Sequence, residues 1–169
     1  RVRGGGVNEG KRGRAVAVVL GRLIRFVLGV PSPLPFILAS ASPRRTELLR
    51  DAGLPHRVVV AAVTEHEDPS TDPAKMVLHN ARLKAAAVSR LHPDALVLGS
   101  DTTVALGDQA LNKPADLAES HAMLRSLSGR EHTVHTGVCL LCPSLGIDES
   151  HDVTAWVRFN VLSEADITR

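Results

Sequence analysis

The stretch from Phe36 to Arg50, FILASASPRRTELLR, constrains the fold more than any other part of the sequence. Its apolar start predicts a short buried strand over residues 36–39, and the residues after it predict a helix that begins at Pro43. Ser42 suits the N-cap position, and Pro43 suits the first helical position because its missing N–H would have no partner there. A strand that turns directly into a helix directs the positive end of the helix dipole into the turn.

The first turn of this helix carries Arg44 and Arg45, although the dipole favours acidic side chains there. Together with the hydroxyls of Ser40 and Ser42, the arginines form a set of anion-binding groups, for which phosphate is a natural ligand. An ordinary capped helix with two solvated arginines would explain the same residues. The stretch alone leaves both interpretations open.

The composition excludes several classes of protein. A chain of 169 residues that is 44% apolar and 22% charged is typical of one globular domain. Three Phe, one Trp and no Tyr argue against binding of single-stranded nucleic acid by aromatic stacking. The net charge of +2 combines +6 over residues 1–35 with −4 over the rest, so the predicted anion site would be a basic spot on an acidic body.

Residues 1–35 are interpreted as a basic N-terminal extension, disordered or loosely helical, in front of a domain over residues 36–169. Arg22 and Arg25 interrupt the apolar run 15–30, which disfavours a transmembrane helix. The small-residue cleavage pattern of a signal peptide is absent from this part of the sequence. We therefore expect no membrane partner and a cytoplasmic location.

The remaining chain alternates helical and strand patterns. Further strands are expected at 57–63, at 95–106 (apolar pieces 95–99 and 104–106 around Asp101), at 109–111, at 132–141 and at 153–161. Helices are expected at 73–91, at 116–127 and from Ser163 onward. The 116–127 helix would begin with an Asp116–Glu119 capping box and end at Gly129. The order β-α-β-α-β-β-α-β-β-α predicts a mixed α/β fold, a twisted mixed sheet flanked by helices.

Cys139 and Cys142 form a C-x-x-C pair without a second pair of metal-ligating residues at suitable spacing. They lie in an apolar run that predicts a strand, whereas a redox pair would be expected at a strand-to-helix turn. We interpret them as structural or incidental thiols. The low cysteine count suits a reducing cytosol.

Four charged residues stand in unusual places. Lys84 falls on the apolar face of the 73–91 helix, where it needs an anionic partner or a route for snorkelling to solvent. Asp101 is an acid inside a predicted strand, where acids are depleted. With Glu65, Lys113 and the serine–arginine turn, these residues make the inventory of a polyphosphate site: cations for phosphate oxygens and carboxylates for a hard divalent ion.

At this point the sequence resembles the Maf family of nucleoside triphosphate pyrophosphatases. Six pieces match in family order: LASASPRR (38–45), AAVTE (61–65), A-x-x-K-A (81–85), GSDTTV (99–104), NKP (112–114) and LSGREHTVHTGV (127–138). Each piece alone is weakly specific, but six in order are highly specific. The resemblance covers residues 36–169.

The resemblance implies an inosine-triphosphatase-like, two-lobed fold with a central cleft. It implies a hydrolase of nucleotide metabolism that converts a nucleoside triphosphate to the monophosphate and pyrophosphate with Mg²⁺, or with Mn²⁺ as an alternative. It assigns phosphate binding to Ser40, Ser42, Arg44 and Arg45, charge neutralisation to Lys84 and Lys113, and the metal site to Glu65 and Asp101. Asp101 would also be the general base. The Pro43-Arg44-Arg45 and 128–138 motifs favour dTTP and UTP over 7-methyl-GTP as substrates.

The sequence departs from the family pattern in three places. Thr64 stands where an Asp is usual, and Asn112 stands where Gly is common. The family's last third is absent, so a C-terminally truncated domain is expected. Two alternatives to an enzyme stay open: a catalytically incompetent nucleotide-binding or regulatory module related to cell division, and a nucleic-acid binder that uses the basic arm. We expect no specific nucleic-acid partner, and a homodimer is left open.

Overall fold

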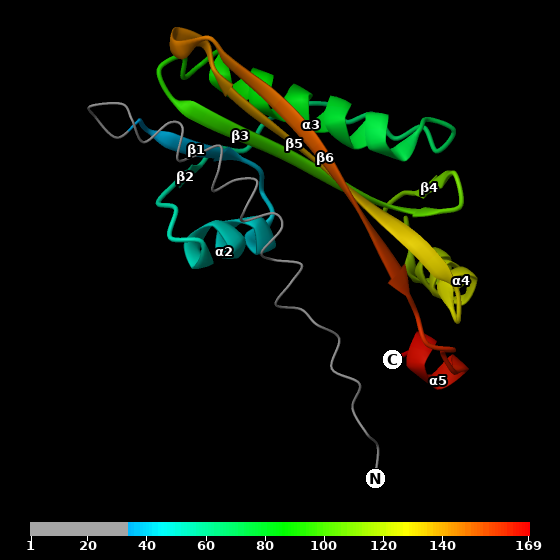
Figure 1. Cartoon of the computed structure of the whole chain (residues 1–169). Coiled ribbons are helices and arrows are strands. Elements are labelled where there is room, and N and C mark those ends of the chain that lie inside the picture. Colours follow the sequence, from blue (N-terminus) through cyan, green and yellow to red (C-terminus); the bar gives the residue numbers. More distant parts are fainter. Residues whose placement is uncertain (1–33) are drawn as a thin grey trace.

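The computed structural model describes residues 34–169 (Figure 1), so the basic extension, apart from its last two residues, lies outside the described part of the chain. The order of elements is the predicted one. The elements are β1 (Phe36–Ala39), α2 (Pro43–Asp51), β2 (Arg57–Val58), α3 (Pro73–Ser89), β3 (Leu96–Leu106), β4 (Gln109–Leu111), α4 (Leu117–Leu127), β5 (Glu131–Cys142), the 3₁₀ turn η1 (Pro143–Leu145), β6 (Ile147–Arg158) and α5 (Glu164–Ile167).

The strands form one mixed sheet in the order β2-β1-β3-β5-β6, with β4 paired to β3. β1 runs parallel to both β2 and β3, whereas the β3–β5 and β5–β6 pairs are antiparallel. The parallel pairs are joined by α2 and α3, as crossover connections require, and the antiparallel ones belong to the second half of the chain. The predicted mixed α/β fold with helices flanking the sheet is confirmed.

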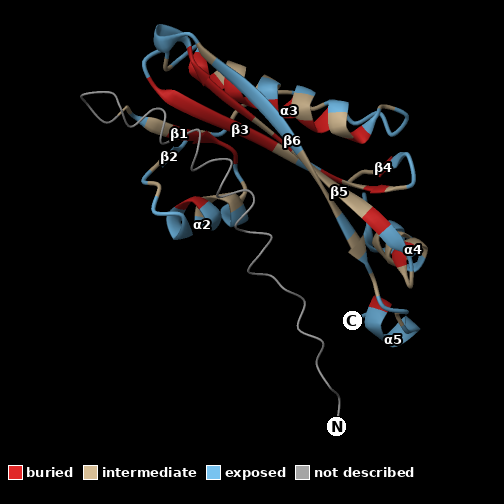
Figure 2. Ribbon diagram, viewed as in Figure 1, coloured by how far each residue is buried: buried red, intermediate tan, exposed pale blue. Residues whose placement is uncertain are grey.

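The two faces of the sheet carry different helices. α3 packs on one face, over a cluster that includes Ala81, Ala85 and Val97, and α2 packs on the other through Leu49 against Leu98. The buried residues concentrate on β1, β3 and the part of β5 beside them, whereas β6 is largely exposed (Figure 2). Because strand residues alternate between faces, odd-numbered β3 residues face α3 and even-numbered ones face α2.

Two glycines allow α3 to lie directly on the sheet. A Cβ on Gly99 would come within 2.1 Å of the Ala81 carbonyl oxygen, and one on Gly137 within 2.4 Å of the Val77 carbonyl oxygen. Any other residue at either position would push the helix off the sheet. This close contact brings the side chains of α3 within reach of β3.

One edge of β3 is open over four residues. β5 occupies the first edge of β3 from Val97 to Ala105, so β1 and β4 share the second edge. β1 pairs there with residues 96–99, and β4 pairs with residues 104–106. Among the described residues no strand pairs with Ser100–Thr103 on this edge, and we call this gap the β3 window.

Several element boundaries differ from the predictions. The strand predicted at 57–63 is only β2, and the residues after Val58 continue without regular structure to the acidic segment. The strand predicted at 95–106 is confirmed as β3, which is continuous because β5 pairs across the polar residues between its two apolar pieces. The last predicted strand, 153–161, begins earlier, at Ile147, and ends at Arg158. Its first half is exposed and charged, so it lacks the alternation that marks a half-buried strand.

The helix ends are largely as predicted. α3 ends at Ser89, so Leu91 lies beyond it and is exposed. Asp116 caps α4 through the Glu119 N–H. The reciprocal bond of the predicted capping box is absent, because the Glu119 carboxylate accepts from the Ala115 N–H instead. Gly129 follows α4 with φ +68°, the left-handed conformation that a terminating glycine supplies.

Cys139 and Cys142 are both free and buried, in agreement with structural thiols. Three residues apart on one strand, they point to opposite faces of the sheet, and each belongs to a different core cluster. They therefore cannot form a disulfide with each other or bind one metal ion. Within residues 34–169, no helix is both long enough and apolar enough to cross a bilayer.

Candidate functional site

The β3 window borders a cavity of about 1030 Å³. Its lining includes all eight residues singled out in the sequence: Ser40, Ser42, Arg44, Arg45, Glu65, Lys84, Asp101 and Lys113. They come from the β1–α2 turn, the acidic segment after β2, α3, β3 and the segment after β4. Residues far apart in the sequence thus meet around one opening in the sheet.

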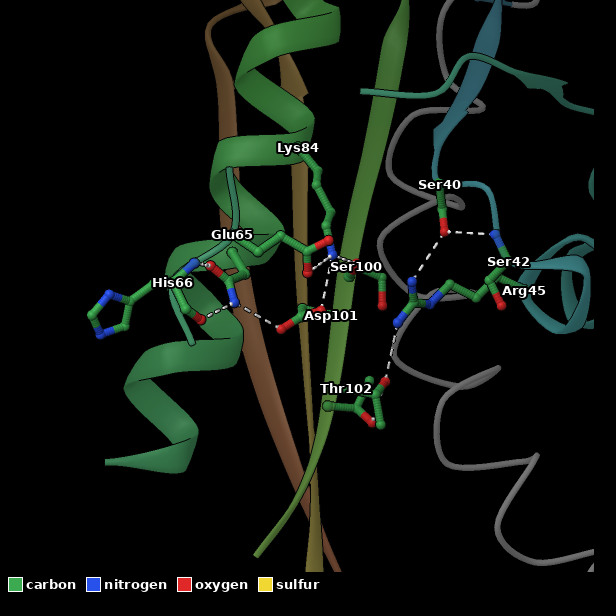
Figure 3. Close-up of polar contacts among 11 residues, drawn as sticks. Ser40, Ser42, Arg45, Glu65, His66, Lys84, Ser100, Asp101 and Thr102 are labelled. Carbon is green, nitrogen blue, oxygen red and sulfur yellow. Dashed lines mark hydrogen bonds and ion pairs between the residues drawn. The ribbon is translucent and has the colours of Figure 1, made fainter. Parts of the chain in front are cut away.

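On the α3 side of the window lies a network that we call the carboxylate wall: Glu65, Asn80, Lys84 and Asp101. The Lys84 ammonium donates to Glu65 Oε2 at 2.7 Å and to Asp101 Oδ1 at 2.9 Å. Lys84 is only 8% exposed, so the anionic partner expected for a lysine on an apolar helix face is present twice. Figure 3 shows Glu65, Lys84 and Asp101 pointing toward one another beside β3.

The electrostatics keep Asp101 ionised. Burial raises the pKa of the Asp101 carboxyl, but the hydrogen bond and positive charge of Lys84, with smaller help from Asn80 and Glu65, outweigh burial and hold the pKa below its ordinary value. With two carboxylates and one ammonium, the wall has a formal net charge of −1.

On the α2 side lies the arginine wall: Ser40, Ser42, Arg44 and Arg45, together with Thr102. Arg45 donates to Ser40 Oγ at 3.0 Å and to Thr102 Oγ1 at 3.2 Å. Its guanidinium points toward these two hydroxyls in Figure 3. Burial lowers the pKa of Arg45, and the nearby charges of Asp101 and Glu65 partly offset this effect. The group stays cationic at any physiological pH.

The start of α2 has an uncapped N-terminus among the described residues. Ser42 occupies the N-cap position as predicted, but its side chain makes no capping hydrogen bond. The Ser42 N–H instead donates to Ser40 Oγ at 3.2 Å. Arg44 and Lys113 also line the cavity, and both are exposed. Within residues 34–169, neither of these two side chains takes part in an ion pair with a protein carboxylate.

The carboxylate wall fits a divalent ion that also binds phosphate. Glu65 Oε2 and Asp101 Oδ1 both contact one ammonium, so two hard oxygen ligands lie close together. Within residues 34–169 no cluster of three or more His, Cys, Asp or Glu side chains could hold a metal alone. Mg²⁺ is commonly bound by one or two carboxylates plus substrate phosphates, which matches this partial set of ligands.

Sequence reasoning missed two residues of the site. Asn80 is 2% exposed and donates to Asp101 Oδ2 at 3.1 Å, and Thr102 holds the Arg45 guanidinium. Asn80 stands four residues before Lys84, on the same face of α3, so a polar residue repeated on that face was the available signal. Thr102 lies inside a strand, where threonine is common, and gave no signal.

Comparison with known proteins gives concordant results. A dTTP/UTP pyrophosphatase of Deinococcus radiodurans is 48% identical over 135 residues, which cover 78% of this chain and 66% of the relative. A dTTP/UTP pyrophosphatase of Akkermansia muciniphila is 47% identical over 133 residues, covering 79% of this chain and 69% of the relative. The chain thus spans about two thirds of the length of these relatives.

Among solved structures, the Ham1 protein of Staphylococcus aureus is similar over 72% of this chain and 70% of its own, with a TM-score of 0.46 and 14% identity. That likeness is too distant to assign a function. The family model for Maf-like protein matches residues 35–169. The chain belongs to the Maf-like protein family.

Proposed function

We propose that this chain is the nucleotide-binding and catalytic part of a nucleoside triphosphate pyrophosphatase, a hydrolase acting on an acid anhydride, with dTTP and UTP as its substrates. The observation that carries the proposal is the pairing of a carboxylate wall with an arginine wall across the β3 window. Two relatives at 47–48% identity are named dTTP/UTP pyrophosphatase, which supports the same substrate class.

The arginine wall would bind the triphosphate. Arg45, the Ser40 hydroxyl and the free N–H groups at the start of α2 are donors for phosphate oxygens. Arg44 and Lys113 line the cavity with charges that no protein carboxylate within residues 34–169 neutralises. A triphosphate carries up to four negative charges, so these cations would supply most of the compensation that its binding requires.

Hydrolysis would occur at the α-phosphate. A water molecule attacks the α-phosphorus, the bond to the bridging α–β oxygen breaks, and pyrophosphate leaves with that oxygen. Asp101 accepts the proton from the attacking water. Its lowered pKa means that the carboxylate is already in the proton-accepting form at neutral pH. Lys84, held between the two acids, would fix the orientation of both and offset negative charge that builds up during the attack.

Glu65 and Asp101 would hold the divalent ion, Mg²⁺ or alternatively Mn²⁺. When bound, such an ion polarises the phosphate oxygens and makes a coordinated water more acidic, which suits a general base with a lowered pKa. A homodimer and a cytoplasmic location stay predictions.

The decisive experiment measures pyrophosphate release from a panel of nucleoside triphosphates that includes dTTP, UTP and 7-methyl-GTP. Wild type is compared with Asp101→Asn, which keeps the shape of the side chain but cannot act as a base. We expect turnover of dTTP and UTP, reduced by about 10²- to 10⁴-fold in the variant, the usual contribution of a general base.

Three other outcomes would change the proposal. Turnover confined to 7-methyl-GTP would correct the substrate. Saturable dTTP binding without turnover would replace the enzyme by a nucleotide-binding module. Absence of both binding and turnover would remove the polyphosphate site from this chain.

A further inference from the structure

The side chain of Asn80 connects two parts of the carboxylate wall that are distant in the sequence. Its Oδ1 accepts from the His66 N–H at 2.8 Å, and its Nδ2 donates to the His66 carbonyl at 2.9 Å. The same Nδ2 donates to Asp101 Oδ2 at 3.1 Å. One amide thus holds the backbone directly after Glu65 and one oxygen of Asp101.

The three bonds use both N–H groups of the amide and one lone pair of its oxygen. Asn80 is 2% exposed, so little water is available to replace a lost partner. The two bonds to His66 also fix the orientation of the amide, since only its oxygen can accept from the backbone N–H. The nitrogen therefore has to face Asp101.

α3 presents Asn80 and Lys84 one helical turn apart, and each side chain holds a different oxygen of Asp101. The Asp101 carboxylate is consequently fixed about its own axis rather than free to rotate. Asn112 adds a second tie to the acidic segment by donating to the Glu67 carbonyl at 2.7 Å. The segment that carries Glu65 is thus anchored from α3 and from the chain after β4.

We propose that Asn80 is a positioning residue that fixes Asp101 and the Glu65–His66 segment relative to each other. Its effect on catalysis rests on the proposed function. Its effect on the segment does not, because the hydrogen bonds to His66 exist in the free protein. Removing the amide should free the Asp101 carboxylate and allow Glu65 to move away from Lys84.

The test compares wild type with Asn80→Leu, Asn80→Asp and Ser89→Ala. Leu removes all three hydrogen bonds at similar volume. Asp keeps an acceptor for the His66 N–H but cannot donate to Asp101 when ionised. Ser89 is the matched control, since it is buried on the same helix and, within residues 34–169, its hydroxyl bonds only to the Ala86 carbonyl of that helix.

Two quantities are measured: steady-state kinetics with dTTP and amide hydrogen exchange of His66 by NMR. In Asn80→Leu we expect kcat to fall about 10- to 100-fold with KM changed less than about threefold, as for residues that orient the groups of a metal site. His66 exchange should become about fivefold faster or more, the equivalent of one lost hydrogen bond. In Asn80→Asp we expect a similar fall in kcat, but slower amide exchange at His66 than in Asn80→Leu. Ser89→Ala should leave both quantities unchanged.

Values of kcat within about threefold of wild type in both Asn80 variants would overturn the catalytic part, and unchanged His66 exchange in Asn80→Leu would overturn the structural part. If the wild type releases no pyrophosphate, the proposed function fails, and His66 exchange alone decides the role of Asn80. If the Leu variant does not fold, kcat in Asn80→Asp decides instead.

Discussion

The two walls of the cavity both contain basic side chains, but these differ in whether they are paired with acids. In the carboxylate wall the cation, Lys84, is paired with two acids and is nearly inaccessible to water. In the arginine wall Arg45 bonds to hydroxyls, and Arg44 is exposed. The cation of the first wall is neutralised within the protein, whereas the second wall has positive charge that a ligand can neutralise. Stability should therefore depend mainly on the first wall and ligand affinity mainly on the second.

The largest effect on stability is expected for Lys84→Met. The substitution keeps the length of the stem but leaves two carboxylates facing each other beside a buried helix face. Breaking a buried ion pair from one side costs about 3–5 kcal/mol. The lower end applies here, because the Glu65 side chain is 30% exposed. Urea unfolding measures the loss.

Arg82→Met is the matched control for this experiment. Arg82 lies two residues earlier on the same helix and pairs with Asp148, but both side chains are about half exposed. Exposed pairs contribute about 0–1 kcal/mol. Equal losses of unfolding free energy in the two variants would contradict the assignment of stability to the carboxylate wall.

The second prediction concerns Arg45→Ala on the opposite wall. Loss of hydrogen bonds to a charged ligand costs about 1.5–3 kcal/mol, so the Kd for dTTP should rise about 10- to 100-fold. The effect on unfolding should be much smaller than that of Lys84→Met, because no acid within residues 34–169 forms an ion pair with Arg45 and would lose its partner. Isothermal titration calorimetry measures the affinity.

Arg50→Ala is the control for Arg45, since it is an exposed arginine in the last turn of the same helix and does not line the cavity. Its Kd for dTTP should equal that of wild type. A similar loss of affinity in both variants would mean that the helix attracts the nucleotide only through its overall charge.

The third prediction uses pH to separate the walls. The pKa of Asp101 is lower in the folded protein than the value of about 3.9 for an unfolded aspartate. The stability that this group contributes is thus fully present above pH about 4 and is lost as pH falls through the folded pKa. The unfolding free energy of wild type should fall more steeply below pH about 4 than that of Asp101→Asn, whereas Arg45→Ala should change the slope less, because Arg45 makes no hydrogen bond to Asp101. Parallel curves for wild type and Asp101→Asn would refute the ion pairing.

The smallest effect is expected at the helix starts. Ser42 makes no capping hydrogen bond, so Ser42→Ala should cost less than about 0.5 kcal/mol. Asp72 caps α3 by accepting from the Lys75 N–H at 3.0 Å, and Asp72→Ala should cost about 1 kcal/mol. Thermal melts of both variants make the comparison. A larger loss for Ser42→Ala would mean that the start of α2 is stabilised by its serine rather than left open for an anion.

Much of this molecule could be predicted from its sequence because the signals were local. The strand–helix turn at Ser42 and Pro43 follows from the residues preferred at helix N-caps, and the apolar face of α3 follows from the helical period. Lys84 and Asp101 were found because each breaks the apolar pattern of a buried element. That they contact each other was implied only by their common need for a partner.

The rest depends on how segments pair, which no local pattern encodes. The β3 window exists because β1 stops at Ala39 and β4 begins pairing at Val104. The dual contact of Asn80 depends on where the irregular segment after β2 lies. The first half of β6 was missed because its pairing with β5 is made by backbone groups while its side chains stay exposed.

The alternation along β3 has a consequence for how the site can fail. Asp101 belongs to one wall and Thr102 to the other solely because neighbouring residues of a strand point to opposite faces. A slip of β3 by one residue against β5 would place the acid among the arginines and the hydroxyl beside Lys84. The nine consecutive residue pairs between β3 and β5 fix the register of β3. This register also determines which wall each charged side chain belongs to, since a shift of β3 by one residue would exchange the two walls.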